Sequence, residues 1–374
     1  MSVGERILIT GGAGFIGSHV ADALLQRGHE VRVLDMLDGQ VHGETTSFPD
    51  YLDRAVERVH GDVRDRDAVR RALDGVNAVY HFAAAVGVGQ SMYEIERYTD
   101  INNRGTAVLL EALLEHPVRK LVVASSMSIY GEGLYLDARG QPHSPQPRAL
   151  DQLKAGRWEV VDDEGQPLEA VPTPETKEAM PESVYALSKY DQEKLCLIYG
   201  RAYNVPVVAL RFFNVYGERQ ALSNPYTGVL AIFASRYLND RAPMIFEDGE
   251  QRRDFVHVRD LAQGCVLALD TDAARDQVFN IGSGDAYTIR QVADKLARVL
   301  GKEHIEPQVA GKYRAGDIRN CFADITRARD VLGYKPSIAL ADGLEELSGW
   351  LATQVGVDRT EAAAMELQQR GLVA

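Results

Sequence analysis

The chain has 374 residues, of which 45% are hydrophobic and 25% are charged. This composition is ordinary for a soluble globular protein of one large or two modest domains. The formal net charge of −13 argues against a nucleic-acid partner, because phosphates would be repelled. No run approaches the roughly 20 apolar residues of a membrane span, and the N-terminus lacks the basic and apolar regions of a signal peptide. With three scattered cysteines, interpreted as reduced thiols, these features predict a cytoplasmic protein without membrane contact.

The first half of the chain alternates between strand and helix patterns. The strand-like runs are short, apolar and continuous, and helical patterns fill the gaps. Continuous apolar strands that alternate with helices indicate a parallel sheet covered on both faces, that is, an α/β fold. The six runs lie at residues 6–10, 30–35, 56–62, 78–83, 120–126 and 205–212.

The first strand leads into a glycine-rich turn and a helix, in the stretch ILITGGAGFIGSHVADALL. Gly11, Gly14 and Gly17 have the GxxGxxG spacing that lets backbone N–H groups and a helix N-terminus approach a pyrophosphate. Asp35 ends the second strand 18 residues after Gly17, where a carboxylate accepts hydrogen bonds from ribose hydroxyls and repels a 2′-phosphate. The pattern predicts a doubly wound, Rossmann-type sheet that binds NAD rather than NADP, with Asp62 as a further contact to the adenine.

Residues 132–183 do not follow the alternation of strand and helix patterns, and they hold seven of the chain's 14 prolines. A loop this long inside a compact domain is usually functional or disordered. This insertion joins the strand that ends at Ser126 to the helix that carries Tyr185. It could therefore cover the site as a lid or extend a dimer contact, and a solvated loop without function is the alternative.

The helix pattern after the insertion carries a second chemical signal. In SVYALSKYDQEKL, Tyr185 and Lys189 are spaced i, i+4 and so project from one helix face. A tyrosine has a reference pKa of about 10, so its ionisation at pH 7 requires roughly 4 kcal/mol. One positive charge at about 4 Å supplies about that much at an effective dielectric constant near 20, and Lys189 and an oxidised nicotinamide would provide two. With the serine strand end at Ser126, this predicts a tyrosine base that takes a proton from a sugar hydroxyl while hydride leaves for NAD.

After about residue 215 the alternation loosens into helical patterns separated by short strands such as MIF and VFNIG. This predicts a smaller, mixed α/β lobe for the substrate. We expect residues 1–212 to form the NAD-binding domain, including the insertion, and residues 213–374 to form mainly the lobe, with parts returning to the first domain. The helical patterns lie at 227–240, 258–270, 288–300 and 341–354.

Motifs along the chain together resemble those of one family. GGAGFIG, HFAAAVGV, SSMSIYG and YALSK, followed by RFFNVYG, RRDFVHVRDLA, FNIGSG and YRAGD, are similar to the extended short-chain dehydrogenase/reductases in their nucleotide-sugar epimerase/dehydratase branch. The resemblance extends to about residue 350 and leaves out the insertion and the C-terminal end.

The resemblance implies roles for residues of these motifs. Ser126 would hydrogen-bond the reacting 4-hydroxyl or 4-keto oxygen, Tyr185 would be the acid and base, and Lys189 would hold the nicotinamide ribose and lower the tyrosine pKa. Substrate would be bound by Ser126, Ser128, Asn214 and Arg253, and at its nucleotide end by Arg314 and Asp317. The cofactor would contact Gly11, Gly14, Phe15, Ile16, Gly17, Asp35, Asp62, Val63, Phe82, Ala83, Ala84, Asn102, Tyr185 and Lys189, with His81 in the same channel wall.

The two positions after Ser126 narrow the expected reaction. The sugar 4,6-dehydratases of the resembled family have Asp and Glu there, and its UDP-glucuronate decarboxylases have Glu at the second position, whereas this chain has Met127 and Ser128. Oxidation and reduction at C4 remain, so we expect a 4-epimerase. SSMSIYGEG, RQALSNPYTG and the insertion resemble dTDP-L-rhamnose 4-epimerase-like members, which make dTDP-6-deoxy-L-talose, and Met127 would suit a C6 methyl group, although methionine also fills gaps in ordinary cores.

Other functions stay open at this point. A related dTDP- or UDP-hexose could be the substrate, and a nucleotide-sugar 4-ketoreductase or UDP-glucuronate decarboxylase would use the same scaffold. A non-catalytic NAD-sensing protein is the alternative from another class, although such proteins usually lose the tyrosine or lysine. The insertion has no cysteine, so we expect no metal. The family resemblance implies a homodimer, and residues 104–115 and 184–203 offer apolar stripes at helical spacing.

Overall fold

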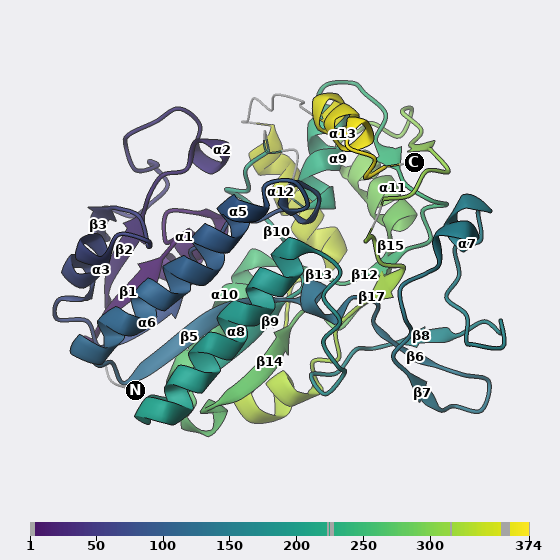
Figure 1. The fold of residues 1–374 in the computed structure, drawn as a ribbon. Helices are drawn as coiled ribbons and strands as arrows, with labels where there is room; N and C mark the ends of the chain where they lie inside the picture. The colour runs from purple at the N-terminus through teal and green to yellow at the C-terminus, as the bar shows by residue number, and fades with distance from the viewer. Residues whose placement is uncertain (1–3, 223, 225–227, 315, 353–359, 374) are drawn as a thin grey trace.

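The computed structural model describes residues 4–222, 224, 228–314, 316–352 and 360–373. Its centre is a seven-stranded parallel sheet with helices on both faces (Figure 1). The order β14-β9-β5-β4-β1-β2-β3 is the Rossmann order with one added strand, and all six strand runs expected from the sequence belong to it. The strands are β1 (Arg6–Thr10), β2 (Glu30–Asp35), β3 (Glu57–His60), β4 (Ala78–His81), β5 (Lys120–Ser126), β9 (Val207–Phe212) and β14 (Gln277–Ile281).

Successive residues of a central strand face two separate hydrophobic cores. Ile7 and Ile9 of β1 point into one core, and Leu8 points into the other. Because both faces are buried, the strands are apolar throughout instead of alternating with polar residues. The first core is covered by α1 (Phe15–Gln26) and α10 (Val258–Asp270), and the second by α3 (Arg66–Leu73), α6 (Gly105–Glu115) and α8 (Val184–Tyr203).

The smaller lobe has a core of its own and lies beyond the carboxyl ends of the central strands (Figure 1). Parts of the chain after residue 212 return to the central sheet, because β14 pairs with β9 and α10 packs against α1. The lobe helices are α9 (Val229–Leu238), α11 (Ile289–Val299) and α12 (Leu340–Leu351), followed by α13 (Thr360–Gln369). Its short strands are β10 (Asn214–Tyr216), β11 (Met244–Ile245), β12 (Arg252–Arg253), β13 (Phe255–His257), β15 (Tyr287–Thr288), β16 (Gln308–Val309) and β17 (Asn320–Cys321).

Short helical segments form several of the connections between the larger elements. The α-helical ones are α2 (Gly39–His42), α4 (Val88–Ser91) and α5 (Ile95–Tyr98). One-turn 3₁₀ or π segments lie at Thr99–Arg104, Met127–Tyr130, Asp272–Ala274 and Ala328–Leu332.

The insertion is folded against the lobe. It contains a small antiparallel sheet in the order β7-β6-β8 and one short helix, and Figure 1 shows it beside β12 and β17. Its backbone donates hydrogen bonds from Gly133 N to Asn320 O (2.7 Å) and from Thr173 N to Phe322 O (2.8 Å). The elements are β6 (Leu134–Leu136), β7 (Pro142–His143), α7 (Leu150–Lys154) and β8 (Glu169–Val171).

Three further features bear on the expectations from sequence. All three cysteines are buried free thiols. Among the residues that the structure describes, no helix is long and apolar enough to span a membrane. Within the same residues, no cluster of His, Cys, Asp and Glu side chains could hold a metal ion, and the expectation of a metal-free protein stays a prediction.

Candidate active site

The glycine turn between β1 and α1 is packed so closely at Gly11 and Gly17 that a side chain is excluded at both positions. Gly11 has a φ of +71°, and a Cβ atom there would lie 2.8 Å from Ala83 N. A Cβ atom on Gly17 would lie 2.5 Å from Gly11 O. At Gly14, by contrast, the nearest atom to an added Cβ is Gly11 O at 3.4 Å, so packing within the protein does not require glycine there. The space above Gly14 at the N-terminus of α1 suits the close approach of a diphosphate.

A cavity of about 410 Å³ begins at this turn and runs along the carboxyl ends of the central strands. It lies where ligands bind in open α/β sheets, at the point where the strand order reverses. Residues expected from sequence to contact the cofactor or the reacting sugar line it together: Gly11, Gly14, Phe15, Ile16, Gly17, Asp35, Asp62, Val63, Phe82, Ala83, Ala84, Ser126, Tyr185, Lys189 and Asn214.

Two acidic residues mark one end of the cavity. The Asp35 carboxylate is held in place by hydrogen bonds from Ala13 N (3.0 Å) and Leu37 N (2.9 Å). Asp62 is clamped by the Arg64 guanidinium at 2.5–3.0 Å. Burial raises the pKa of Asp62, but the hydrogen bonds from Arg64 outweigh it and leave the pKa below its usual value. Both carboxylates therefore have fixed orientations before a ligand arrives.

Ser126 ends β5 and caps the following 3₁₀ turn. Its Oγ accepts a hydrogen bond from Ser128 N at 3.2 Å, and the two serine hydroxyls are 2.8 Å apart. The two hydroxyls therefore form one hydrogen-bonded pair at the strand end. Ser126 lines the cavity, and Ser128 lies behind it.

Tyr185 stands in the first turn of α8. Its backbone N–H donates to Ser91 Oγ at 3.0 Å, and its ring meets the Tyr98 ring edge to face at 6.4 Å. Burial raises the pKa of Tyr185 above its ordinary value, and a hydrogen bond with Ser126 offsets part of that increase. The protein environment by itself thus favours the neutral phenol, so the base form needs nearby positive charge.

The Lys189 side chain is 3% exposed, and burial lowers its pKa to about 8. Its Nζ donates to Gln192 Oε1 at 2.6 Å. The Gln192 amide is fixed in turn, because its Nε2 donates to Thr106 Oγ1 at 2.8 Å and lies 3.3 Å from His81 Nε2. The lysine therefore has a neutral, oriented partner one helical turn away.

His81 and Asn102 support the cavity from behind and do not line it. The His81 ring bonds Thr10 Oγ1 (2.8 Å) and Thr106 Oγ1 (2.9 Å), and burial together with Lys189 lowers its pKa to about 3. The Asn102 side chain bonds both backbone groups of Ala85 and the hydroxyl of Ser188. Both residues are fully engaged with protein groups, which explains how they stiffen the wall made by Phe82–Ala85.

Asn214 lines the cavity, whereas the neighbouring Met127 does not. Asn214 donates through Nδ2 to Asp254 O (2.9 Å) and toward Met127 Sδ (3.4 Å). Met127 is 8% exposed and packs in a small core with Tyr130 and Phe213. Met127 is therefore mainly a core residue, and its sulfur lies against Asn214.

Arg253, Arg314 and Asp317 come together on the lobe, away from the lining of this cavity. Asp317 lies 3.5 Å from Arg253 Nη2 and 3.6 Å from Arg314 Nε, and the Arg314 guanidinium stacks on the Phe246 ring at 4.3 Å. The three residues form one polar cluster, and their expected role in binding the substrate stays a prediction. None of residues 132–183 lines the cavity in the described structure, so the structure gives the lid hypothesis no support.

The sequence reading missed the residues that orient Lys189. Gln192 follows Lys189 by three positions, so the two share one helix face. That spacing could have indicated that Gln192 lies beside the lysine. The sequence reading also missed Arg148 of the insertion and Arg319, which are buried among carboxylates. No local pattern marks them, because their partners lie far away in the sequence.

Comparison with known proteins places the chain in a family. The model of the NAD dependent epimerase/dehydratase family matches residues 7–282. A dTDP-L-rhamnose 4-epimerase of Burkholderia thailandensis is 35% identical, over 94% of this chain and 96% of the relative. A UDP-glucose 4-epimerase of Thermotoga maritima, solved with UDP-glucose, is 31% identical with a TM-score of 0.76, and the match covers 93% of this chain and 98% of that one.

A UDP-glucose 4-epimerase of Thermus thermophilus, solved with NAD, is 30% identical with a TM-score of 0.72, and the match covers 94% of this chain and 100% of that one. The cavity agrees with this cofactor, since an open glycine at a helix N-terminus and an acid at the end of β2 suit a dinucleotide. The chain therefore belongs to the NAD dependent epimerase/dehydratase family, among its NAD-dependent nucleotide-sugar epimerases, which are isomerases.

Proposed function

We propose that this protein is a nucleotide-sugar 4-epimerase that converts dTDP-L-rhamnose to dTDP-6-deoxy-L-talose or acts on a related dTDP- or UDP-hexose. The observation that carries the proposal is the meeting of Ser126, Tyr185 and Lys189 in one cavity whose adjoining strand end lacks carboxylates. The similarity to the Burkholderia thailandensis enzyme supports the choice of sugar.

In this proposal the protein's own residues remove one proton from the C4 oxygen and return it. Tyr185 takes the proton from the 4-hydroxyl and later returns it, and Ser126 hydrogen-bonds the same oxygen throughout. NAD, when bound, supplies the hydride chemistry at C4. Lys189 contributes the positive charge that a buried tyrosine needs, because burial alone raises the tyrosine pKa.

The positions after Ser126 favour epimerisation over elimination or decarboxylation. The Ser128 hydroxyl bonds Ser126, and Met127 is packed in a core. Neither side chain can exchange a proton with C5 or C6 as a carboxylate would. A 4-ketoreductase is the remaining alternative on this scaffold, and it would consume a reduced cofactor instead of recycling it.

At the other end of the substrate, Arg253, Arg314 and Asp317 are the proposed nucleotide contacts, with Arg253 and Asn214 serving the diphosphate. The cluster already holds two guanidinium groups beside one carboxylate. Guanidinium groups bind phosphate oxygens through two parallel hydrogen bonds, and a carboxylate accepts hydrogen bonds from ribose hydroxyls. The cluster thus has the chemistry of a nucleoside diphosphate site.

Asp35 should make the protein selective for NAD. Its fixed carboxylate would repel the 2′-phosphate of NADP. We expect NAD to bind at least about tenfold more tightly than NADP, a difference of roughly 1.4 kcal/mol, and Asp35→Ala to remove most of that preference. Equal affinity of the native protein for both cofactors would count against this role.

We also propose a homodimer formed through α6 and α8. Large apolar side chains of these helices are exposed, among them Leu114 (47%), Leu187 (49%) and Ile198 (55%). Leu187 and Ile198 are separated by 11 residues and so lie on one face of α8. A monomeric mass at micromolar concentration in light scattering would contradict the dimer. The cytoplasmic location stays an expectation from sequence.

The test of the proposed function is incubation of the NAD-loaded protein with dTDP-, UDP- and GDP-sugars, followed by NMR of the sugar C4 position. We expect inversion at C4 without net change of cofactor, most rapidly for dTDP-L-rhamnose. Stoichiometric formation of oxidised cofactor from added NADH with a 4-keto sugar would instead establish a reductase.

A further inference from the structure

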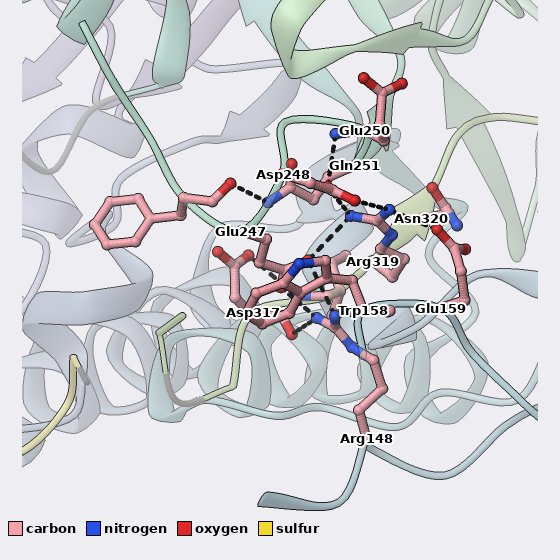
Figure 2. Close-up of polar contacts among 12 residues, drawn as sticks. Arg148, Trp158, Glu159, Glu247, Asp248, Glu250, Gln251, Asp317, Arg319 and Asn320 are labelled. Atoms are coloured by element: carbon pink, nitrogen blue, oxygen red, sulfur yellow. Dashed lines mark hydrogen bonds and ion pairs between the residues drawn. The ribbon is translucent and has the colours of Figure 1, made fainter. Parts of the chain in front are cut away.

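A cluster of charges with a buried centre fastens the insertion to the lobe (Figure 2). At its centre are Arg148 of the insertion, Glu247 and Arg319, whose side chains are 3%, 1% and 1% exposed. Arg319 also pairs with Asp248 at 2.6 Å and with Glu159 of the insertion at 2.6 Å. We call these five residues the insertion clamp.

Arg148 connects three segments that are distant in the sequence. Its Nη1 and Nη2 atoms donate to the two carboxylate oxygens of Glu247 at 3.0 and 2.8 Å. Nη1 also donates to Trp158 O at 3.0 Å, and Nη2 donates to Asp317 O at 3.1 Å. A planar guanidinium can satisfy these acceptors together, whereas a lysine ammonium cannot match the paired geometry.

The two lobe segments that Arg148 joins are those that carry the proposed nucleotide contacts. Phe246, next to Glu247, stacks against Arg314, and Asp317 supplies both the carbonyl that Arg148 binds and the carboxylate of the cluster. Arg253 is held by the same turn, since it donates to Ile318 O at 2.5 Å and Arg319 O at 2.9 Å. The insertion is therefore linked to Arg253, Arg314 and Asp317 through one or two contacts.

The turn at Glu247 needs such a fastening. Glu247 has a φ of +53°, a left-handed conformation that costs a non-glycine residue about 1–3 kcal/mol unless its surroundings enforce it. Its backbone N–H donates to Lys312 O at 2.7 Å, and its carboxylate lies between Arg148 and Arg319. Without Arg148 the buried Glu247 carboxylate would keep only Arg319 as an ion-pair partner, and the turn would lose its link to Asp317.

We propose that Arg148 is a positioning residue for the nucleotide end of the substrate, so that the insertion presets the turns bearing Phe246, Arg314 and Asp317 for a nucleoside diphosphate. The inference rests on the proposed function for the identity of the ligand. Arg148 itself touches neither the cavity nor, in this proposal, the ligand. Preorganised turns lower the ordering cost of binding, so the insertion raises affinity without taking part in chemistry.

The experiment measures binding of dTDP and UDP, without the sugar, to NAD-loaded protein by titration calorimetry. Arg148→Met should weaken nucleoside diphosphate binding at least tenfold and raise KM for the sugar nucleotide similarly, while kcat stays within about threefold of native. Arg157→Met, at an exposed position of the same insertion, is the matched control and should bind as the native chain does. Native affinity in folded Arg148→Met, or a fall in kcat with unchanged KM, would overturn the proposal.

A double-mutant cycle separates positioning from general loss of stability. In an Arg314→Met background, Arg148→Met should weaken binding by a smaller factor than in the native chain, because one of the groups that it positions is already gone. Fully additive effects would reject the proposal. If Arg148→Met does not fold, Arg148→Lys replaces it: a loss of at least threefold in affinity supports the proposal, and native affinity rejects it.

The probe distinguishes failure of this inference from failure of the proposed function. Weakened dTDP or UDP binding in the variant, with no epimerisation of any sugar by the native chain, would leave Arg148 in its role and reject the epimerase proposal. Epimerisation by the native chain, with native nucleotide affinity in the variant, would support the epimerase proposal and reject the positioning role of Arg148. A native chain that binds neither nucleotide would reject both.

Discussion

Two buried cationic regions of this molecule are built in opposite ways. Lys189 has a neutral partner, Gln192, and the described residues place no carboxylate in an ion pair with it. The neighbouring carboxylate, Glu193, is turned to Arg211 at 2.8 Å. Arg148 and Arg319, by contrast, have only carboxylates as side-chain partners within the described part of the chain.

The difference follows from what each charge does. A cation paired with a carboxylate has little field left to act on other groups, but it ties distant segments together when both are buried. A cation with a neutral partner keeps its field at short range, and Tyr185 is one helical turn from Lys189. Lys189 is therefore suited to changing the ionisation of Tyr185, whereas Arg148 and Arg319 are suited to holding distant segments of the chain together.

The largest effect should come from removing the group on which Lys189 acts. Tyr185→Phe should lower kcat by about 10²–10⁴-fold, as expected for a lost general base. Bound NAD, measured after release from the purified protein, and the thermal midpoint should remain native, because the phenyl ring keeps its packing. Near-native turnover in this variant would exclude Tyr185 as the base.

In the ion-paired region, loss of one cation should show in stability. Arg319→Met should lower the free energy of unfolding by about 3–5 kcal/mol, because three carboxylates lose a buried partner. Arg66→Met is the matched control, since its pair with Glu111 is exposed (53% and 60%) and should contribute less than about 1 kcal/mol. Urea unfolding measures the free energy of unfolding of both variants. Equal losses in the two would contradict the difference expected between a buried and an exposed ion pair.

The uncompensated charge of Lys189 should make stability depend on pH. Burial lowers its pKa to about 8 from 10.5, so between these values the unfolded chain binds the proton and the native chain does not. The free energy of unfolding should therefore rise with pH from about 8 to 10.5, by roughly 3 kcal/mol at most. Denaturant titrations of the native chain and Lys189→Met should diverge over this window, and parallel curves would contradict it.

A smaller effect on activity should follow from placing a carboxylate beside Lys189. Gln192→Glu should offset the lysine field and raise the pKa of Tyr185 by about one unit. The value of kcat/KM at neutral pH should fall about tenfold, and its ascending limb should move to higher pH. Gln192→Met, which is neutral, should leave the position of that limb unchanged. A Gln192→Glu profile that superimposes on the native one would refute the argument.

Local signals predicted the strands of the central sheet and part of the cavity lining, and the family resemblance supplied other lining residues such as Phe82 and Asn214. Apolar runs marked six strands, and Gly11, Gly14 and Asp35 could be placed by spacing alone. The i, i+4 spacing of Tyr185 and Lys189 located the site on one helix face. The glycines lie in one strand–turn–helix unit, Asp35 ends the next strand, and Tyr185 and Lys189 share one helix, so short-range spacing determines these positions.

Other features depended on contacts between segments far apart in the chain. Asn102 was expected near the cofactor channel; its amide bonds Ser188 and Ala85, and Ala85 lines the cavity. Met127 was considered for the sugar pocket, but it packs into a core. The insertion was considered as a lid, and its anchor is an ion pair between Arg148 and Glu247, 99 residues apart. Such pairings have no signature in a single sequence.

The cysteines offer a practical consequence for spectroscopy. Burial raises the pKa of Cys196 and Cys321 to about 12 and that of Cys265 further, and the thiolate is the form that reacts with maleimides. The native thiols should therefore stay unlabelled while the protein is folded. A dye attached through Arg157→Cys, at an exposed site of the insertion, would be the single dye on the molecule. Its anisotropy would report motion of the insertion relative to the lobe without removal of any native cysteine.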